Sequence, residues 1–183
     1  LPPESGFETA FDKDRTHALA ARLGIPVPES RLINDASELD LEAARAGPLY
    51  VKPVHSKVWK DGRGHSLVPE LVRDDAELRR ALERFLPLTP VQVQQYFPGQ
   101  GVGVEVLCRD GEVVMHFAHR RLHEYPLTGG RSTYREAVAA RPEWLEATRS
   151  LMRALDWQGV AMVELKVNAR GYALMEINGR FWG

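Results

Sequence analysis

The chain has 183 residues, of which 44% are hydrophobic and 27% charged, and its formal net charge is -1. This composition is that of a soluble globular chain, long enough for one substantial core or for two small lobes with a cleft between them. The even mixture of charges argues against bulk electrostatic binding to nucleic acid or to an anionic membrane.

The first half of the chain predicts helices and short strands. Asp12 can cap a helix from Lys13 to Leu23, which Gly24 ends. The polar, basic segment Val54–His65 predicts a mobile loop. Asp74 caps a second helix, in which apolar residues recur at helical spacing as far as Phe85. Strands are predicted at four places, in chain order: Arg31–Ile33, Leu49–Pro53, Ser66–Leu71 and Val91–Gln95.

The second half predicts mainly strands. A strand, a turn at Asp110-Gly111 and another strand run to about Phe117, and Gly129-Gly130 marks a loop. Pro142 opens a helix, and the last two strands are Val160–Val167 and Tyr172–Phe181. The chain is therefore expected to be α+β, with a seam near Val91–Gly99. It ends directly on a strand, which suggests a fragment of something longer.

The single cysteine, Cys108, excludes a disulfide framework and any cysteine-based zinc site. It lies in an apolar run and is interpreted as a buried, inert thiol, with a reactive thiol as the alternative. No apolar stretch approaches the ~18 residues that span a bilayer, and the N-terminus is no signal peptide, so a cytoplasmic location is expected.

The last two strands carry the strongest indication of chemistry. Asn168–Gly171 suits a three-residue hairpin turn with a bulge, which places Asn168 opposite Tyr172. Pairing then sets Glu164 opposite Glu176 and Met162 opposite Asn178. One face of this hairpin is apolar and predicted to face a core: Ala161, Val163, Leu165, Val167, Ala173, Met175, Ile177 and Phe181. The other carries Glu164, Lys166, Glu176, Asn178 and Arg180.

Two carboxylates directly opposite each other repel and destabilise a sheet, so a cation between them is expected. Mg²⁺ fits, because it is typically held by one or two carboxylates, an amide oxygen and phosphates. The alternative is a solvated outer face on which Lys166 and Arg180 screen the acids. A turn different by one residue would break the pairing argument.

Basic residues elsewhere are less specific. Lys52 at a strand end, followed by a glycine-containing basic loop, fits phosphate binding or simply a charged surface. No GxGxxG or P-loop lysine motif is present. The histidines His55, His119 and His123 have no metal-ligand spacing. Arg120 and Arg121 point to opposite sides of a strand, so at most one can face the side of Glu164.

In order, these segments resemble the ATP-grasp superfamily, which includes carboxylate–amine ligases, biotin carboxylase and the large chain of carbamoyl phosphate synthetase. The resemblance covers nearly the whole chain from Asp12 onward. The matching segments are Asp12-Lys13, Gly24–Pro28, Tyr50–Pro53, Val93–Gly99, Val104–Leu107, Val163–Lys166 and Leu174–Arg180.

The resemblance implies a fold of two α+β lobes, residues 1–93 and 94–183, with ATP held in the cleft between antiparallel sheets. It implies phosphate contacts from Lys13 and Lys52, and a hinge whose backbone binds adenine, formed by Gln94, Gln95, Tyr96 and Phe97. Glu164, Glu176 and Asn178 match the family's ligands for Mg²⁺, with Mn²⁺ as a substitute. Arg180 matches the arginine that stabilises transferred phosphate or an anionic substrate, and Arg121 resembles a basic position facing the substrate.

The chain departs from the family pattern in three places. Gly101-Val102-Gly103 stands where many members have an acidic residue, and Glu105 follows two positions later, so the roles of Glu105 and Arg120 stay open. The usual Asn-Pro-Arg ending is Asn178-Gly179-Arg180. The domain that precedes Lys13 in complete members, and helps to form the substrate site, is absent from this sequence.

The implied activity is an ATP- and Mg²⁺-dependent ligase that activates a carboxylate as an acyl phosphate for attack by an amine. The partners would be ATP and a small-molecule carboxylate, without nucleic acid or membrane, and a homodimer is one assembly that the sequence allows. Residues His119–Leu122 and Thr128–Ser132 form a candidate lip for an anionic acceptor, or a basic surface loop. The alternatives to the ligase are a nucleotide-binding module without turnover and a purely structural domain.

Overall fold

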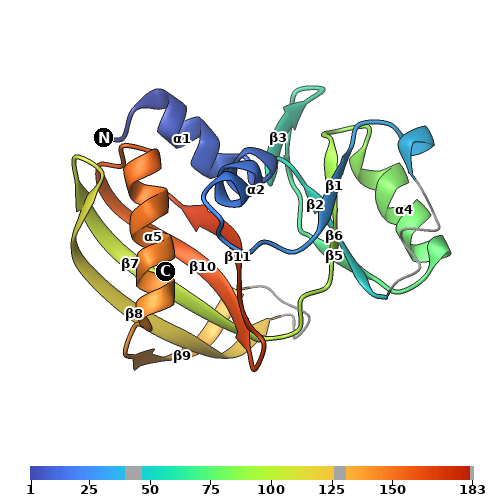
Figure 1. Ribbon diagram of the computed structural model, residues 1–183. Coiled ribbons are helices and arrows are strands. Elements are labelled where there is room, and N and C mark those ends of the chain that lie inside the picture. Colours follow the sequence, from blue (N-terminus) through green and yellow to red (C-terminus); the bar gives the residue numbers. More distant parts are fainter. Residues whose placement is uncertain (40–46, 126–130, 182–183) are drawn as a thin grey trace. The chain divides into compact units, whose positions relative to one another are not determined.

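The computed structural model describes residues 1–39, 47–125 and 131–181 and divides the chain into two compact units (Figure 1). The discontinuous unit joins Leu1–Val27 to Phe97–Gly183, and the continuous unit is Pro28–Tyr96. Each has its own sheet and its own hydrophobic core, and each is described by itself. The mixed α and β content and the antiparallel sheets agree with the expected fold class.

This division differs from the expected lobes at residues 1–93 and 94–183. The seam at Tyr96–Phe97 lies within the predicted stretch, but the first 27 residues belong with the second half of the chain. Packing explains the difference, because Ile25 is buried in the same core as Leu174, whose backbone N–H donates to the Pro26 carbonyl at 2.8 Å. Such long-range contacts leave no local signal in sequence.

The continuous unit contains a four-stranded antiparallel sheet with the order β1-β6-β2-β5. Its strands are β1 (Ser30–Ile33), β6 (Val91–Gln95), β2 (Leu49–Pro53) and β5 (Glu70–Val72), and a short 3-10 turn, η1, spans Ala36–Glu38. The predicted strands at Leu49–Pro53 and Val91–Gln95 are confirmed. The predicted strand at Ser66–Leu71 is displaced toward β5 because Ser66 belongs to another hairpin.

Helix α4 (Asp75–Phe85) covers this sheet and begins as predicted. The Asp74 carboxylate accepts from the Glu77 N–H at 2.8 Å, and the Glu77 carboxylate accepts from the Arg73 N–H at 2.8 Å. These bonds satisfy N–H groups that a helix start leaves unpaired. The apolar stripe of α4 is buried against the strands, with Leu78 and Leu82 at 1% and 2% exposure.

The segment predicted to be a mobile loop, Val54–His65, forms a hairpin instead. Its strands are β3 (Lys57–Lys60) and β4 (Arg63–Ser66). Asp61 and Gly62 join them, both with positive φ, 51° and 72°. This geometry matches the right-handed twist of paired strands. Asp-Gly is a strong sequence signal for such a hairpin turn, but the prediction of a loop followed the basic composition of the segment instead.

The discontinuous unit contains a five-stranded antiparallel sheet with the order β11-β10-β7-β8-β9. The strands are β7 (Gln100–Arg109), β8 (Glu112–Tyr125), β9 (Arg131–Val138), β10 (Gly159–Asn168) and β11 (Gly171–Asn178). The helices are α1 (Glu4–Phe11), α2 (Lys13–Arg22) and α5 (Pro142–Ala154). Helix α1 and strand β9 were not predicted, and the expected loop at Gly129-Gly130 lies outside the described residues.

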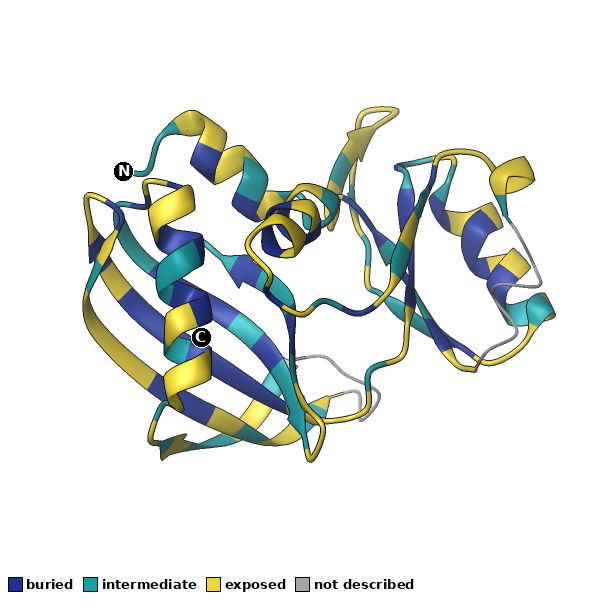
Figure 2. Ribbon diagram, in the orientation of Figure 1, coloured by how far each residue is buried: buried dark blue, intermediate teal, exposed yellow. Residues whose placement is uncertain are grey.

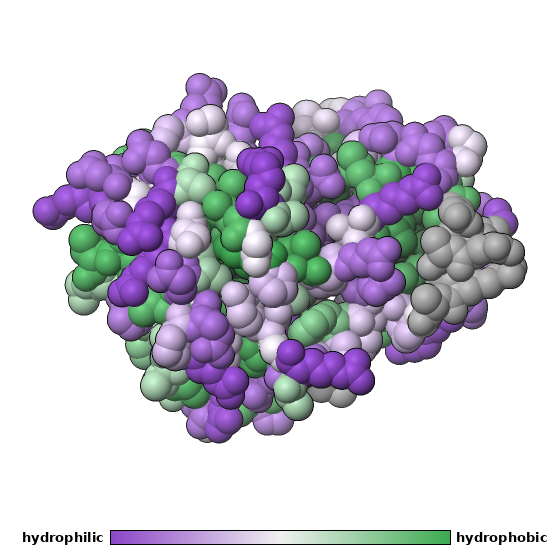
Figure 3. All heavy atoms as spheres, in the orientation of Figure 1, coloured by the Kyte–Doolittle hydropathy of each residue, from purple (hydrophilic) through white to green (hydrophobic). Residues whose placement is uncertain are grey.

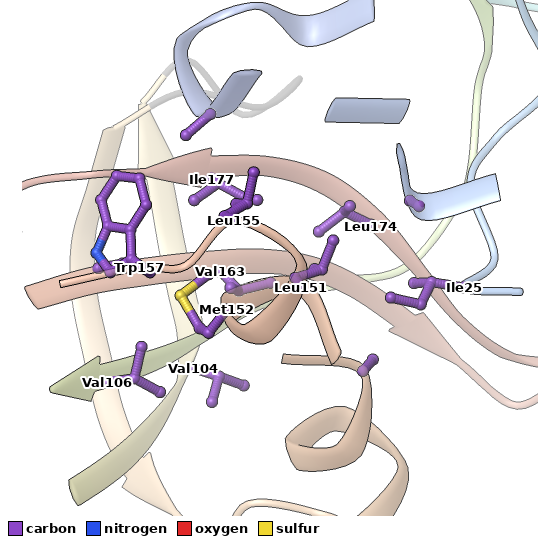
Figure 4. Close-up of a cluster of buried hydrophobic side chains, with 14 of the residues drawn as sticks. Ile25, Val104, Val106, Leu151, Met152, Leu155, Trp157, Val163, Leu174 and Ile177 are labelled. Atoms are coloured by element: carbon purple, nitrogen blue, oxygen red, sulfur yellow. The ribbon is translucent and has the colours of Figure 1, made fainter. Parts of the chain in front are cut away.

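Helix α2 confirms the predicted start, because the Asp12 carboxylate accepts from the N–H groups of Asp14 and Arg15. Helix α5 crosses one face of the sheet (Figure 1). Leu151, Met152 and Trp157 lie opposite Val104 of β7 and Val163 of β10 (Figure 4). These side chains are almost fully buried, and Figure 2 shows the buried stretches of the strands in dark blue.

Cys108 belongs to this core, with 4% exposure. Burial raises the pKa of its thiol to about 11, and the Glu112 charge adds to the shift. The prediction that this thiol is buried is therefore confirmed, and its raised pKa agrees with an inert thiol.

Hydrophilic side chains dominate the face drawn in Figure 3, with apolar side chains between them. Within the described ranges, every helix falls short of the length and apolar character that crossing a membrane requires.

Candidate functional site

The β10–β11 hairpin brings the predicted acidic pair together. Glu164 lies opposite Glu176 and Met162 opposite Asn178, as predicted. The turn and the strand regularity that produce this register differ from the prediction, however. The turn has two residues rather than three, so Asn168 pairs with Gly171 and not with Tyr172, and a bulge beyond the Leu165–Leu174 pair then restores the expected pairing.

The bulge changes which residues of β11 face the core. Leu174 is fully buried in the core cluster, whereas the predicted core residue Met175 is only partly buried and does not belong to the cluster. The prediction for Met175 was wrong because strict alternation fails at a bulge. The prediction for Phe181 was wrong because β11 ends at Asn178, and Phe181 is exposed. The Met175 carbonyl lies 3.2 Å from Nε2 of His17, which fixes the irregular strand to α2.

Glu164, Glu176 and Asn178 meet on the sheet face opposite α5, called the site face below. The Asn178 side-chain Nδ2 donates to Glu164 Oε1 at 3.0 Å and to Glu176 Oε1 at 3.2 Å. Both carboxylates therefore direct an oxygen at one point. A rotation of the carboxamide would present Asn178 Oδ1 there instead.

Arg121 reaches this acidic pair from β8. Its Nη2 lies 2.5 Å from Glu164 Oε1, and its Nη1 lies 3.3 Å from Glu124 Oε1. Arg120 points the other way and pairs with Glu136 on β9. The expectation that at most one of the two arginines faces Glu164 is confirmed, and Arg121 is that residue.

The surroundings of Glu164 disfavour the charged form of its carboxyl group. Burial, followed by the nearby charge of Glu176, raises the pKa of the Glu164 carboxyl to about 7, and Arg121 only partly offsets these effects. Burial opposes protonation of Arg121, yet the charges of Glu164 and Glu124 raise the pKa of its guanidinium. The Glu164 and Glu176 carboxylates therefore disfavour each other's ionisation at this point of the site face.

Glycines of β7 form the floor beneath these charges. A Cβ on Gly101 would lie 2.8 Å from Arg121 Cδ and 2.9 Å from Glu124 Oε1. A Cβ on Gly103 would lie 2.4 Å from Cε1 of His119. The departure Gly101-Val102-Gly103 therefore has a steric reason, because side chains of β8 occupy the space that an acidic residue of β7 would need.

Glu105 and His119 form a buried pair beside this floor that sequence reasoning did not find. His119 Nδ1 lies 2.5 Å from Glu105 Oε1, and both residues are 1% exposed. His119 Nε2 and Glu105 Oε2 have no hydrogen-bond partner among the described residues. Period-2 alternation on paired strands predicts that the two side chains lie on one face of the sheet. It does not predict the register that brings them into contact.

Arg180 lies just beyond β11 and its Nη2 donates to Asn178 Oδ1 at 3.2 Å. Both predicted arginines, Arg121 and Arg180, thus border the acidic pair in the structure. The candidate lip extends from β8, where His119–Leu122 belong to the strand, to a segment of which Thr128–Gly130 lie outside the described residues.

The candidate nucleotide contacts divide between the units. Lys13 is the first residue of α2 in the discontinuous unit, which also contains Phe97. Lys52 lies on β2 with its Nζ 5.8 Å from the centre of the Tyr50 ring. Two more candidates, Gln94 and Gln95, end strand β6, and Tyr96 follows them in the continuous unit. Gln94 is buried, with 1% exposure.

The side chains of the site face suit a hard divalent cation whose remaining ligands come from a substrate. In the part of the chain that the structure describes, no group of three or more His, Cys, Asp or Glu side chains could hold a metal. The cluster has two carboxylates and one carboxamide, so phosphate oxygens and water would complete a six-coordinate Mg²⁺ shell.

Comparison with known proteins bears on this arrangement. Residues 88–183 match the protein family described as "ATP-grasp in the biosynthetic pathway with Ter operon". The carbamoyl phosphate synthase large chain of Thermus thermophilus is 31% identical over 97% of this chain. A cyanophycin synthetase of Trichormus variabilis is 29% identical over 73% of it. The chain spans only 18% and 14% of the length of these relatives.

Solved structures show the same fold. D-alanine–D-alanine ligase from Bacillus anthracis, complexed with ATP, superimposes with a TM-score of 0.72 at 20% identity, covering 97% of this chain and 56% of the ligase chain. The ligase PsnB, complexed with a precursor peptide and AMPPNP, gives a TM-score of 0.67 at 22% identity, covering 98% of this chain and 52% of PsnB.

Proposed function

Because the chain belongs to the ATP-grasp family, we propose that it binds ATP with Mg²⁺ and activates a carboxylate as an acyl phosphate for attack by an amine. The observation that carries this proposal is the convergence of Glu164, Glu176 and Asn178 on one point of the site face. A relative named cyanophycin synthetase, and the structural likeness to ligases, support the same class of chemistry.

The proposed reaction has two steps. An oxygen of the substrate carboxylate attacks the γ-phosphorus of ATP, the bond to the β-phosphate oxygen breaks, and ADP leaves. The nitrogen of an amine then attacks the acyl carbon, phosphate departs, and the nitrogen loses a proton. No side-chain nucleophile is required, so the protein positions the reactants and neutralises charge.

Each candidate residue has a role in this proposal. Glu164, Glu176 and the Asn178 carboxamide would hold Mg²⁺, or Mn²⁺ in its place. When bound, the cation would neutralise charge on the ATP phosphates. Lys13 and Lys52 would contact the phosphates.

The remaining candidates would bind the nucleotide base and the transferred group. The backbone of Gln94, Gln95, Tyr96 and Phe97 would bind the adenine edge. Arg180 would stabilise the transferred phosphoryl group, and Arg121 would face the anionic acceptor. A cytoplasmic location, a small-molecule carboxylate as substrate and a homodimer remain part of the proposal.

Calorimetry with a non-hydrolysable ATP analogue tests the metal assignment. We expect binding that requires Mg²⁺ and disappears in Glu176→Ala. The matched control is Glu146→Ala, which removes an exposed glutamate from α5 and should leave binding intact. Unchanged binding in Glu176→Ala would overturn the metal assignment.

Phosphate release separates the ligase from a nucleotide-binding module without turnover. The chain is incubated with ATP, Mg²⁺ and panels of carboxylates and amines. Release that depends on both a carboxylate and an amine supports the ligase, whereas binding without release in every mixture supports the module.

A further inference from the structure

Arg121 occupies the position at Glu164 where a metal ion would be expected. Its Nη2 lies 2.5 Å from Glu164 Oε1, the same oxygen that accepts from Asn178 Nδ2 at 3.0 Å. The oxygen proposed to bind the cation therefore already has two donors. One of them, the guanidinium, is itself a cation.

The Arg121 position is built into the fold and is not an accidental surface contact. The side chains of Arg121, Glu164 and Glu124 are only 13%, 14% and 15% exposed. The floor beneath Arg121 and Glu124 is Gly101, where a Cβ would lie within 3 Å of both side chains. Exposed ion pairs contribute little, but a pair this buried is held in one geometry.

A divalent cation and Arg121 cannot share Glu164 Oε1 favourably. Mg²⁺ binds carboxylate oxygens at 2.0–2.1 Å. A cation on Oε1 would therefore lie within about 4.6 Å of the present position of Arg121 Nη2. Like charges at such a distance repel strongly where little water screens them.

Glu124 offers Arg121 a second partner on the same strand. Its Oε1 is 3.3 Å from Arg121 Nη1, so the guanidinium bridges Glu164 and Glu124 with different nitrogens. A guanidinium that releases Glu164 can therefore stay beside the site, with Nη2 available to another anion. The planar fork of arginine suits a carboxylate or phosphate acceptor at that nitrogen.

We propose that the divalent cation displaces Arg121 from Glu164, and that Glu124 is the positioning residue that retains Arg121 at the site afterwards. This inference rests on the proposed function. Its consequence is an order of events, since the guanidinium becomes available to an anionic acceptor only when the cation is in place. By linkage, an acceptor anion that pairs with the released Arg121 raises the affinity for the cation.

Mn²⁺ alone, titrated into the metal-free full chain and followed by electron paramagnetic resonance of the free ion, tests the exchange. Arg121→Gln removes the competitor and should tighten Mn²⁺ binding by about 5- to 100-fold. Arg120→Gln is the matched control, because Arg120 is the neighbouring residue but pairs with Glu136 on the other face of the sheet. It should change the affinity less than about twofold, as a distant exposed charge does.

Glu124→Gln and the double variant test the positioning role. Glu124→Gln should weaken Mn²⁺ binding, because a neutral carboxamide attracts the Arg121 guanidinium less than the carboxylate does, so that Arg121 holds Glu164 more firmly. In the Arg121→Gln background the same change should have almost no effect. An equal weakening in both backgrounds would mean that Glu124 acts directly on the cation, and would overturn its role as a positioning residue.

The outcomes separate the inference from the function on which it rests. Mn²⁺ binding that is lost in Glu176→Gln but is unchanged or weaker in a folded Arg121→Gln overturns the exchange alone. No saturable Mn²⁺ binding by the wild-type chain overturns both. If Arg121→Gln does not fold, Arg121→Lys and arginine ¹⁵N NMR of the wild type replace it. One Nε resonance, assigned by its absence in the lysine variant, should shift on Mg²⁺ addition, and no shift overturns the exchange.

Discussion

Glu164 shows how much of the site depends on single side chains. It accepts from Arg121 and Asn178, and it faces Glu176 across the strand pair. The sequence predicted the Glu164–Glu176 pair from hairpin pairing. It did not predict Glu124 as a partner of Arg121, because that contact depends on the Gly101 floor on another strand.

The raised pKa of Glu164 predicts how stability changes with pH in the absence of metal. Between the ordinary glutamate pKa of about 4.3 and about 7, the folded chain keeps a proton on Glu164 that the unfolded chain has released. The free energy of unfolding contributed by this group therefore falls as pH rises through this window.

Chemical denaturation in chelator at several pH values measures this effect. Relative to wild type, Glu164→Gln should become progressively more stable from about pH 4.5 to about pH 7 and then level off. A difference that does not change with pH would contradict the raised pKa.

Gly103 gives a second prediction at this scale. In Gly103→Ala the new Cβ would meet the His119 ring at 2.4 Å, so the ring must leave its place beside Glu105. Overpacking of this kind costs roughly 1–3 kcal/mol. Urea unfolding measures the loss, and Gly64→Ala serves as control, because its Cβ would meet Trp59 at an ordinary 3.4 Å. Equal stability of the two variants would contradict the prediction.

Among the elements, the β10–β11 hairpin has the predicted pairing of Glu164 with Glu176, but its turn and its bulge were not predicted. The turn is one residue shorter than expected, and the bulge before Glu176 corrects the register. Both arrangements fit the local sequence. Tertiary packing selects the observed one, because Leu174 enters the core and bonds to Pro26, which no hairpin rule contains.

The sequence predicted helix α4 and its Asp74 cap, and the contribution of this cap can be measured. Asp74→Ala removes the acceptor of the Glu77 N–H and should cost about 1 kcal/mol in the unfolding of the continuous unit. Asp74→Ser keeps an acceptor and should restore most of the loss. Urea unfolding, with hydrogen exchange of the α4 amides as the probe, measures the change. An equal loss of stability in both variants would exclude capping as the cause.

At the scale of the whole molecule, the two units have separate cores. Two lobes were expected, but the residues that build each core could not be predicted. Short and alternating apolar runs predicted which residues are buried but not which core each belongs to. The continuous unit ends at Tyr96, within the expected seam Val91–Gly99, and the first 27 residues belong to the discontinuous unit with the second half of the chain.

Separate cores predict separate responses to cavities. Leu82→Ala in the continuous unit and Leu151→Ala in the discontinuous unit each remove a side chain with at most 2% exposure. Each should destabilise its own unit by about 2–5 kcal/mol. Hydrogen exchange measured by mass spectrometry should show faster exchange mainly in the mutated unit. Uniform acceleration across both units would show that they unfold together.

The discontinuous unit also has a consequence for the order in which the protein can fold during translation. His17 lies against Met175, and 158 positions separate them in the chain. At about 5–20 residues per second, a ribosome adds that stretch in roughly 8–30 seconds. Synthesis of the continuous unit finishes at Tyr96, within this interval, whereas strand β11, which packs against α1 and α2, is made only at its end. The nascent chain therefore carries the apolar faces of its first two helices uncovered until the last strand is made.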